Sequence, residues 1–272
     1  MDRRKFLAGL ASLPVAGLAR DLSPYPTLSE TANTMQIVNP YRYSKQDLML
    51  EFPGDAYIQT ATLPTSDPLL LYNTSFTICG WVNQFSGGGN YPRVIDKSTG
   101  PNGGDGFSVI LLPDTNEIRC YAGGKLAVTT TMPTLDTEFF FMWRHSPTGL
   151  HYLTINDDPD VNGSGRELPN TSAKVVLGNW YDPAATGRSL YGTLNDIRVY
   201  KRFIDSPIDV GDRELIYANK NGNVVVDSDL VAWWKFDEGT PNATATVANS
   251  IIDSSGNGYH GTPYGSPVYR AA

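Results

Sequence analysis

The sequence predicts an all-β protein, a two-sheet antiparallel jelly-roll sandwich with one short helix. From residue 47 onward, short apolar runs alternate with turn-forming residues. Gly and Pro account for 26 and 19 of the 272 residues, which is rich in turns but short of a disordered composition. Only residues 206–219 have a helix-like composition. Strands that are this numerous and evenly spaced are typical of a sandwich.

Tight-turn sequences separate several pairs of strand-like runs at hairpin distance. These turns lie at 53–55 (Pro-Gly-Asp), 113–116 (Pro-Asp-Thr-Asn) and 146–149 (Ser-Pro-Thr-Gly), where Pro, Gly and Asn favour a chain reversal. Alternation along the last run predicts that one of Trp233 and Trp234 faces outward. The expected strands are residues 48–52, 56–60, 76–82, 93–97, 107–112, 117–121, 139–143, 150–155, 174–177, 194–200 and 230–236.

The first 19 residues have the three parts of a secretory signal peptide: a basic head, a short apolar stretch and small residues at its end. The run Arg-Arg-Lys-Phe-Leu at 3–7 resembles a twin-arginine signal. The alternative is an amphipathic helix that packs on the domain. Residues 20–46 are polar and contain prolines, so we expect a linker or a wrapping arm. The export interpretation predicts a periplasmic, cell-surface or secreted protein.

The charge disfavours nucleic-acid partners. Lys and Arg number 21 against 28 Asp and Glu, a net charge of −7, and the chain without its basic leader is near −9. No run of about 18 apolar residues occurs, so we expect no transmembrane helix in the mature chain.

The two cysteines, Cys79 and Cys120, both lie inside expected strands. An exported protein could pair them, but spacing alone does not bring their Cβ atoms together. A disulfide and two buried free thiols therefore both stay open, and neither cysteine has the local sequence of a catalytic thiol.

Six segments together resemble laminin G-like domains of the concanavalin A-like jelly-roll class, over about residues 47–272. The strand series at 76–82, 93–97 and 106–109 is similar to that of the family, and Gly-Thr-Leu-Asn-Asp-Ile-Arg-Val-Tyr-Lys-Arg at 192–202 is similar to its closing strand. Residues 230–238 and 253–261 look like its opening strand and the loop that follows. The resemblance implies this fold and a role in binding.

The order of these segments departs from the family, because the opening pair comes last. One interpretation is a circular permutation in which 229–272 supplies the opening strands. The other is that 229–272 begins a second, truncated domain. About 44 residues alone would not bury their own Trp and Phe side chains, which favours permutation.

Signatures of catalysis are absent from the sequence. A glycoside hydrolase needs two carboxylates that converge on one bond, and no Glu-x-Asp-x-Glu strand pattern occurs. There is also no Gly-x-Ser-x-Gly, His-Glu-x-x-His or Cys-x-x-Cys. His145 and His151 flank one hairpin turn and are expected to be ordinary hairpin residues, while His260 is expected to be a structural hydrogen-bonding group. The sequence therefore predicts a protein that is not an enzyme.

Calcium is the ion that the acidic loops favour. Ca²⁺ takes six to eight oxygen ligands from Gly-containing loops, and the loop Asp253-Ser-Ser-Gly-Asn257 offers such groups. The family resemblance implies that this loop lies beside the closing strand, which would add Asp196 to Asp253 and Asn257 as ligands of a structural Ca²⁺. The alternative is that Asp253 and Asn257 only form Asx turns.

A second, weaker calcium candidate comprises Asp158, Asp160 and Asn162, which match the first half of an Asp-x-Asp-x-Asn-Gly loop. Its twelfth position, where a Glu should complete the site, is Pro169. Otherwise these are solvated turn residues.

Aromatic residues in loops provide the candidate ligand-binding surface, because Trp and Tyr rings stack on sugar C–H faces. Trp180 and Tyr181 precede Asp182-Pro183 in an expected loop, and Tyr91 lies in the Gly-rich segment 87–92. The alternative is that these rings pack over the edge of the sandwich.

These observations predict an exported, non-catalytic binding module that recognises a glycan or a surface protein. One alternative is a structural or adhesive part of a cell-surface or virion assembly. A weaker alternative is a glycoside hydrolase or lyase whose site has no recognised signature.

Overall fold

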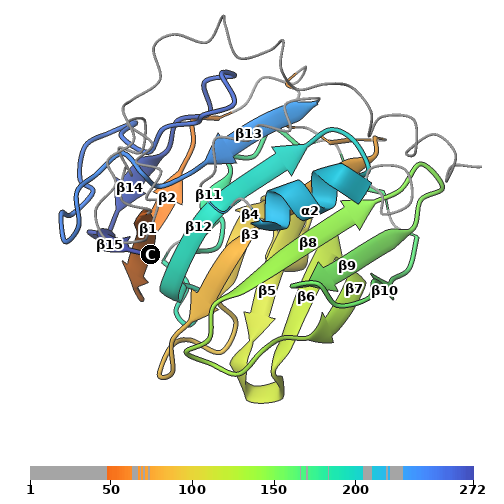
Figure 1. The fold of residues 1–272 in the computed structure, drawn as a ribbon, viewed down its shortest axis with the longest axis horizontal. Helices are drawn as coiled ribbons and strands as arrows, with labels where there is room; N and C mark the ends of the chain where they lie inside the picture. The colour runs from red at the N-terminus through yellow and green to blue at the C-terminus, as the bar shows by residue number, and fades with distance from the viewer. Residues whose placement is uncertain are drawn as a thin grey trace, which may run out of the picture. The chain divides into compact units, whose positions relative to one another are not determined.

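The protein is a sandwich of two antiparallel sheets, as the sequence predicted (Figure 1). In the described chain, one sheet has the order β10-β9-β8-β3-β12-β1-β15, and β13 also pairs with β12. The other sheet has the order β14-β2-β11-β4-β5-β6-β7. We call these sheet A and sheet B. The computed structural model describes residues 48–62, 67, 69, 71–72, 74–165, 167–169, 171–182, 184–204, 210–218, 220 and 229–272.

The strands agree with the expected runs and add several short ones at the sheet edges. Sheet A contains β1 (Leu48–Pro53), β3 (Phe76–Gln84), β8 (Phe139–His145), β9 (His151–Ile155), β10 (Val161–Asn162), β12 (Tyr191–Tyr200), β13 (Leu230–Trp234) and β15 (Val268–Ala271). Sheet B contains β2 (Tyr57–Gln59), β4 (Arg93–Lys97), β5 (Phe107–Leu112), β6 (Glu117–Ala122), β7 (Lys125–Thr131), β11 (Val176–Leu177) and β14 (Thr262–Tyr264).

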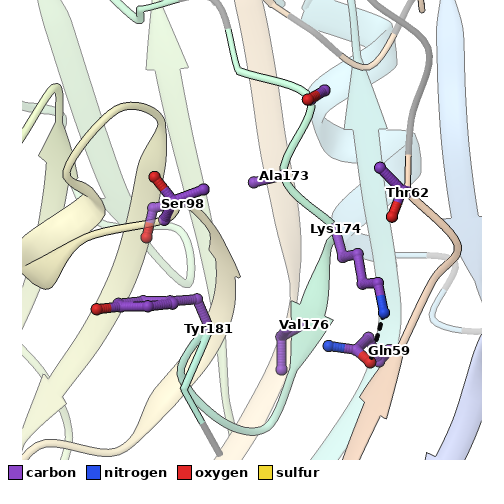
Figure 2. Close-up of a pocket in the computed structure, with 9 residues that line it drawn as sticks. Gln59, Thr62, Ser98, Ala173, Lys174, Val176 and Tyr181 are labelled. Atoms are coloured by element: carbon purple, nitrogen blue, oxygen red, sulfur yellow. Dashed lines mark hydrogen bonds between the residues drawn. The ribbon is translucent and has the colours of Figure 1, made fainter.

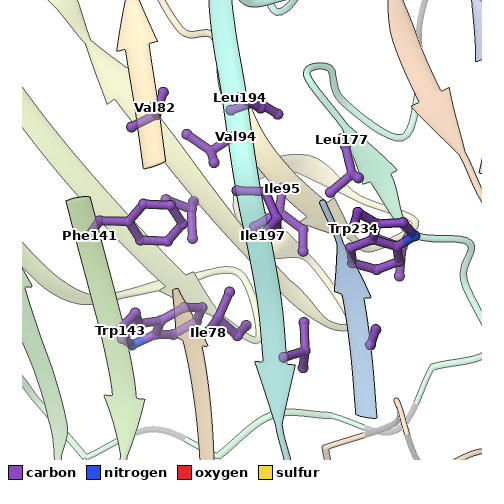
Figure 3. Close-up of a cluster of buried hydrophobic side chains, with 14 of the residues drawn as sticks. Ile78, Val82, Val94, Ile95, Phe141, Trp143, Leu177, Leu194, Ile197 and Trp234 are labelled. Atoms are coloured by element: carbon purple, nitrogen blue, oxygen red, sulfur yellow. The ribbon is translucent and has the colours of Figure 1, made fainter. Parts of the chain in front are cut away.

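The main core fills the space between the sheets. In β6, alternate side chains enter this core: Ile118 and Cys120 are buried in it, whereas Arg119 and Tyr121 face away from it. Removing this apolar surface from water provides most of the free energy that stabilises a sandwich. The residues in Figure 3 come from both sheets and include Val82, Val94, Ile95, Phe141, Trp143, Leu177, Leu194, Ile197 and Trp234.

The C-terminal segment supplies strands to both sheets. In sheet A, β15 pairs with β1 and β13 pairs with β12; in sheet B, β14 pairs with β2. The side chain of Trp234 lies fully buried in the main core. The segment thus completes the sandwich that the middle of the chain builds. Circular permutation of a laminin G-like domain stays a prediction, because strand pairing does not reveal the ancestry of the strand order.

Neither tryptophan of β13 is exposed, although alternation turns them to opposite faces. Trp233 is 1% exposed and lies outside the main core cluster. Arg198 and Lys235 lie over its ring, 4.4 and 4.1 Å from the centroid, and its Nε1 donates to Asp196. The charged ends of these two side chains lie over an outward-facing ring that would otherwise contact solvent.

The predicted helix is present as α2 (Val210–Ala218), which lies beside the outer face of sheet A in Figure 1. Its Ile216 belongs to a second hydrophobic cluster with Cys79, Phe140 and Tyr200, and Tyr217 stacks on Trp81. The strand β7 was not predicted, because its sequence, Lys-Leu-Ala-Val-Thr-Thr-Thr, contains only a short run of apolar residues.

The proposed signal peptide (residues 1–19) and linker (20–46) lie outside the described residues. Among those that are described, no helix has the length and apolar character needed to cross a bilayer.

Replacing Trp234 by Ala tests whether the C-terminal segment belongs to the core. Loss of a fully buried indole is expected to lower the free energy of unfolding by about 3–5 kcal/mol, measured by urea unfolding. The matched control in the same segment is Val247→Ala, since Val247 is 68% exposed and should change stability by about 0.5 kcal/mol or less. Equal, small effects of the two substitutions would contradict the pairing of this segment with both sheets.

Candidate functional site

A hollow of about 350 Å³ opens on the outer face of sheet B. Strand register builds its floor: Arg93, Ile110 and Arg119 lie opposite one another on β4, β5 and β6. Residues that face each other in an antiparallel sheet share one face, so this row points away from the main core. We call this site the aromatic hollow, and it is lined by Tyr91, Asn102, Ile110, Leu112, Arg119, Tyr121 and Arg188.

One wall of the hollow comes from the connection between β11 and β12, residues 178–190, which we call the covering loop; its residue 183 is not described. Backbone bonds fasten it to the start of β4: Tyr91 N donates to Gly187 O and Arg93 N donates to Arg188 O, both at 3.1 Å. A Cβ atom on Gly89 would lie 2.7 Å from the Gly187 carbonyl group. Glycine at 89 therefore permits the close approach of the two loops.

Aromatic rings and guanidinium groups stack where these loops meet. The Arg188 guanidinium carbon lies 4.9 Å from the ring centroid of Tyr91 and 5.1 Å from that of Trp180. Arg93 lies 5.8 Å from the Trp180 ring, and Tyr181 meets Trp180 edge to face at 4.5 Å. Tyr91 remains 46% exposed. The stack therefore fixes the side chains while it leaves an aromatic ring accessible.

Beneath the stack lies a buried ionic pair. Arg93 and Asp96 are both fully buried, with Nε and Oδ2 3.9 Å apart. Burial lowers the pKa of Arg93 to about 10, an effect that Asp96 opposes and the nearby Arg188 reinforces. Burial likewise raises the pKa of Asp96 to about 6, although hydrogen bonds with hydroxyl groups oppose that rise. Among the described residues, Arg93 uses Nη1 to donate to Tyr91 O and has no acceptor for Nε or Nη2.

A second, smaller pocket of about 310 Å³ lies beside Tyr181 (Figure 2). In the view, Tyr181 and Ser98 stand on one side, with Lys174, Gln59 and Thr62 on the other, and Lys174 Nζ donates to Gln59 at 3.3 Å. The polar side-chain groups of its lining are hydroxyls, the amide of Gln59 and the ammonium group of Lys174. The full lining is Gln59, Thr62, Ser98, Thr99, Ser172, Ala173, Lys174, Val176 and Tyr181.

The structure brings the predicted ligand-binding residues Tyr91, Trp180 and Tyr181 into one neighbourhood. Tyr91 lines the aromatic hollow, Trp180 supports Arg188 beside it, and Tyr181 lines the second pocket. Sequence reasoning missed Arg188, Arg119, Tyr121 and Asn102. In β6, Glu117, Arg119 and Tyr121 alternate with buried residues, a pattern that predicts that Arg119 and Tyr121 face outward. Their proximity to Arg188 depends on how the covering loop folds.

The first predicted calcium ligands lie near one another around β13. Asp253 accepts hydrogen bonds from Trp233 N, Ser255 N, Ser255 Oγ and Tyr259 N at 2.8–3.0 Å, and Asn257 Nδ2 donates to Val231 O at 2.8 Å. Asp196 forms a two-point ion pair with Arg198. Both oxygens of each carboxylate therefore already accept from donors, an arrangement that fits the Asx-turn alternative better than a calcium cage. Calcium here stays a prediction.

In the second calcium candidate, a carboxylate likewise interacts with arginine side chains of the protein. Asp160 pairs with Arg144 and lies 3.7 Å from Arg213, while Asp158 and Asn162 are exposed. In the described part of the chain, no three His, Cys, Asp or Glu side chains gather in a way that could hold a metal ion.

Cys79 and Cys120 are both buried and free. They belong to different hydrophobic clusters, Cys79 beneath α2 and Cys120 between the sheets, so the alternative of a disulfide is not realised in this structure. Of the histidines, His151 accepts from Trp143 Nε1 at 3.1 Å and His260 accepts from Asp253 N at 3.0 Å. These are structural hydrogen bonds.

Solved structures with a similar fold include a provisionally assigned carbohydrate binding protein from Bacteroides ovatus. The two are 14% identical, with a TM-score of 0.57 over 83% of this chain, and this chain spans 60% of that protein's length. At such identity the likeness establishes the fold alone: a jelly-roll β-sandwich of two antiparallel sheets. No family model and no curated protein matches the sequence.

Weaker likenesses involve two proteins of other kinds. The native heptameric SAP-like pentraxin from Limulus polyphemus is 17% identical, with a TM-score of 0.48, over 69% of this chain and 92% of its own. The sialidase of Trypanosoma rangeli in complex with the inhibitor DANA is 16% identical, with a TM-score of 0.39, over 53% of this chain and 23% of its own.

Asp96→Asn is expected to change how stability depends on pH. The folded protein retains a proton on Asp96 up to about pH 6, whereas the unfolded chain releases it near the ordinary value of 3.8. The folded state thus binds more protons within this window, so the contribution of Asp96 to the free energy of unfolding falls as pH rises from about 4 to about 6. Removing the carboxyl group should abolish roughly 2 kcal/mol of that fall, measured by urea unfolding.

The matched control is Asp114→Asn, which removes an exposed carboxylate. Parallel pH profiles for wild type and Asp96→Asn would show that Asp96 does not titrate within this window.

Proposed function

We propose that the protein is an exported, non-catalytic binding module that holds a glycan in the aromatic hollow of sheet B. The observation that carries this proposal is the convergence of Tyr91, Tyr121, Arg119, Arg188 and Asn102 on one open hollow. These residues come from four separate parts of the chain, so their convergence does not follow from local sequence.

The chemistry of the lining suits a pyranose. Tyrosine rings offer flat apolar faces to sugar C–H groups, and guanidinium and amide groups donate hydrogen bonds to its hydroxyls. A volume of about 350 Å³ lies at the lower end of the range for small-ligand pockets. One or two sugar units fit this size, with the rest of a chain outside.

Side-chain placement supports binding without catalysis. Among the described residues around the hollow, Asp96 is fully buried, and Glu117 receives two hydrogen bonds from Arg119. Glycoside hydrolysis needs two carboxyl groups that both reach the scissile bond, and neither of these is free to do so. The name of the Bacteroides ovatus protein, which shares the fold, agrees with glycan binding.

Recognition of a surface protein is the second candidate, and a structural or adhesive part of an assembly is the third. A protein interface needs about 800 Å² on each partner with apolar anchors at its centre, whereas this hollow is small and strongly polar. We therefore favour the glycan.

Tyr91→Ala should weaken glycan binding at least about tenfold, because it removes the exposed ring of the stack. The measurement is a glycan array followed by calorimetric titration with the saccharides that bind. The matched control is Tyr264→Ala, a tyrosine of similar exposure (42%) on edge strand β14 that does not line the hollow.

Trp180→Ala is the companion variant, since Trp180 supports Arg188 without lining the hollow. Circular dichroism spectra and melting temperatures would establish that each variant is folded. Glycan binding that survives both the Tyr91 and the Trp180 substitutions, or an array without any bound glycan, would contradict the proposed function.

A further inference from the structure

The aromatic hollow is a positively charged site on a protein whose net charge is negative. The whole chain carries a net charge of −7. The described residues that line the hollow, in contrast, include Arg119 and Arg188 and no Asp or Glu, and a third arginine, Arg93, lies beneath them. Electrostatic potential at a cleft depends on this local balance more than on the net charge of the molecule.

Two of the three arginines have a carboxylate partner. Arg119 donates from Nη2 and Nε to Glu117 at 2.6 and 3.2 Å. Arg93 lies 3.9 Å from Asp96. The acidic residue of the covering loop, Asp182, accepts a hydrogen bond from Ala184 N at 3.2 Å. Within the described chain, Arg188 has no ion pair and no side-chain hydrogen bond, only its two aromatic contacts.

Stacking holds Arg188 in place without using its donors. A guanidinium group that lies over aromatic faces keeps its N–H groups available around its edge, where they match the two oxygens of a carboxylate or sulfate. The backbone of Arg188 is fixed as well, because its carbonyl accepts from Arg93 N. A fixed arginine loses little conformational freedom when it binds an anion, which favours affinity.

The buried pair beneath the hollow does not neutralise Arg188. Burial is the main cause of the lowered pKa of Arg93, and Arg188 adds to it because the two positively charged guanidinium groups repel each other. An anionic group bound beside Arg188 would relieve that repulsion.

We propose that the hollow selects an anionic saccharide, whose carboxylate or sulfate is bound by Arg188 while a sugar face contacts Tyr91. This inference rests on the proposed glycan-binding function and adds the class of ligand to it. Carboxylate and sulfate share the chemistry that Arg188 recognises, so the experiment includes both.

Matched pairs of saccharides test this proposal by calorimetric titration of the full chain. Oligogalacturonate is compared with its methyl ester, and dextran sulfate with dextran. We expect at least one anionic member to bind about tenfold or more tightly than its neutral counterpart, the factor that corresponds to one charge-assisted hydrogen bond. Arg188→Gln should abolish that preference.

The matched control is Arg270→Gln, which removes the same charge from an arginine that pairs with Glu51 between β15 and β1 of sheet A. It should change affinity less than about twofold, because its charge is distant and screened. Arg188→Lys keeps the charge and loses the planar fork, and it should retain part of the preference. Melting temperatures close to wild type would establish that these variants are folded.

The outcomes separate this inference from the function on which it rests. Neutral members that bind as tightly as anionic ones, through Tyr91, would overturn the anionic preference and leave glycan binding in place. If Arg188→Gln and Arg270→Gln lower the affinity for the anionic saccharide equally, the preference arises from the overall charge of the protein and not from Arg188. That result would also overturn the inference. Absence of binding to every saccharide on the array would overturn the proposed function itself.

Discussion

The burial of Arg93 is the constraint on which the site depends. Removing a charged guanidinium group from water costs several kcal/mol of folding free energy, unless nearby groups of the protein interact with the charge. In this protein the compensation comes from Asp96 at 3.9 Å, from the carbonyl of Tyr91 and from the Trp180 ring above. The covering loop must lie over sheet B to supply that ring and to exclude water. The same placement carries Arg188 to the rim of the hollow, so a structural requirement of β4 also positions the group that we propose binds the ligand.

The sandwich beneath this site depends on its C-terminal segment. Asp253 gathers four donors, and Asp196 joins Arg198 of β12 to the indole of Trp233 on β13. Carboxylates that accept several hydrogen bonds fix a loop firmly, which explains why a segment with few long strands still joins both sheets. Asp253 and Asp196, two of the predicted calcium ligands, therefore stabilise the fold through hydrogen bonds and an ion pair within the protein.

Periodicity made most of the fold predictable, since the apolar alternation of β6 and the apolar runs of β3, β5 and β8 are strong signals. Short edge strands such as β10 and β14 have two or three residues and no signal of their own. The site was predictable in part: Trp180 and Tyr91 were identified from their loop positions. Arg188 was not, because its role arises from contacts between segments that lie far apart in the sequence. No local pattern indicates that this arginine has no carboxylate partner among the described residues.

Nuclear magnetic resonance of the ¹⁵N-labelled protein, titrated with oligogalacturonate, tests the central claim most directly. The five tryptophans provide indole signals throughout the molecule. We expect the resonances of the Trp180 indole and the Arg188 Nε–H to shift with added saccharide, whereas those of Trp143 and Trp234 in the main core stay in place. Shifts concentrated around residues 253–259, with none at the covering loop, would contradict binding in the aromatic hollow.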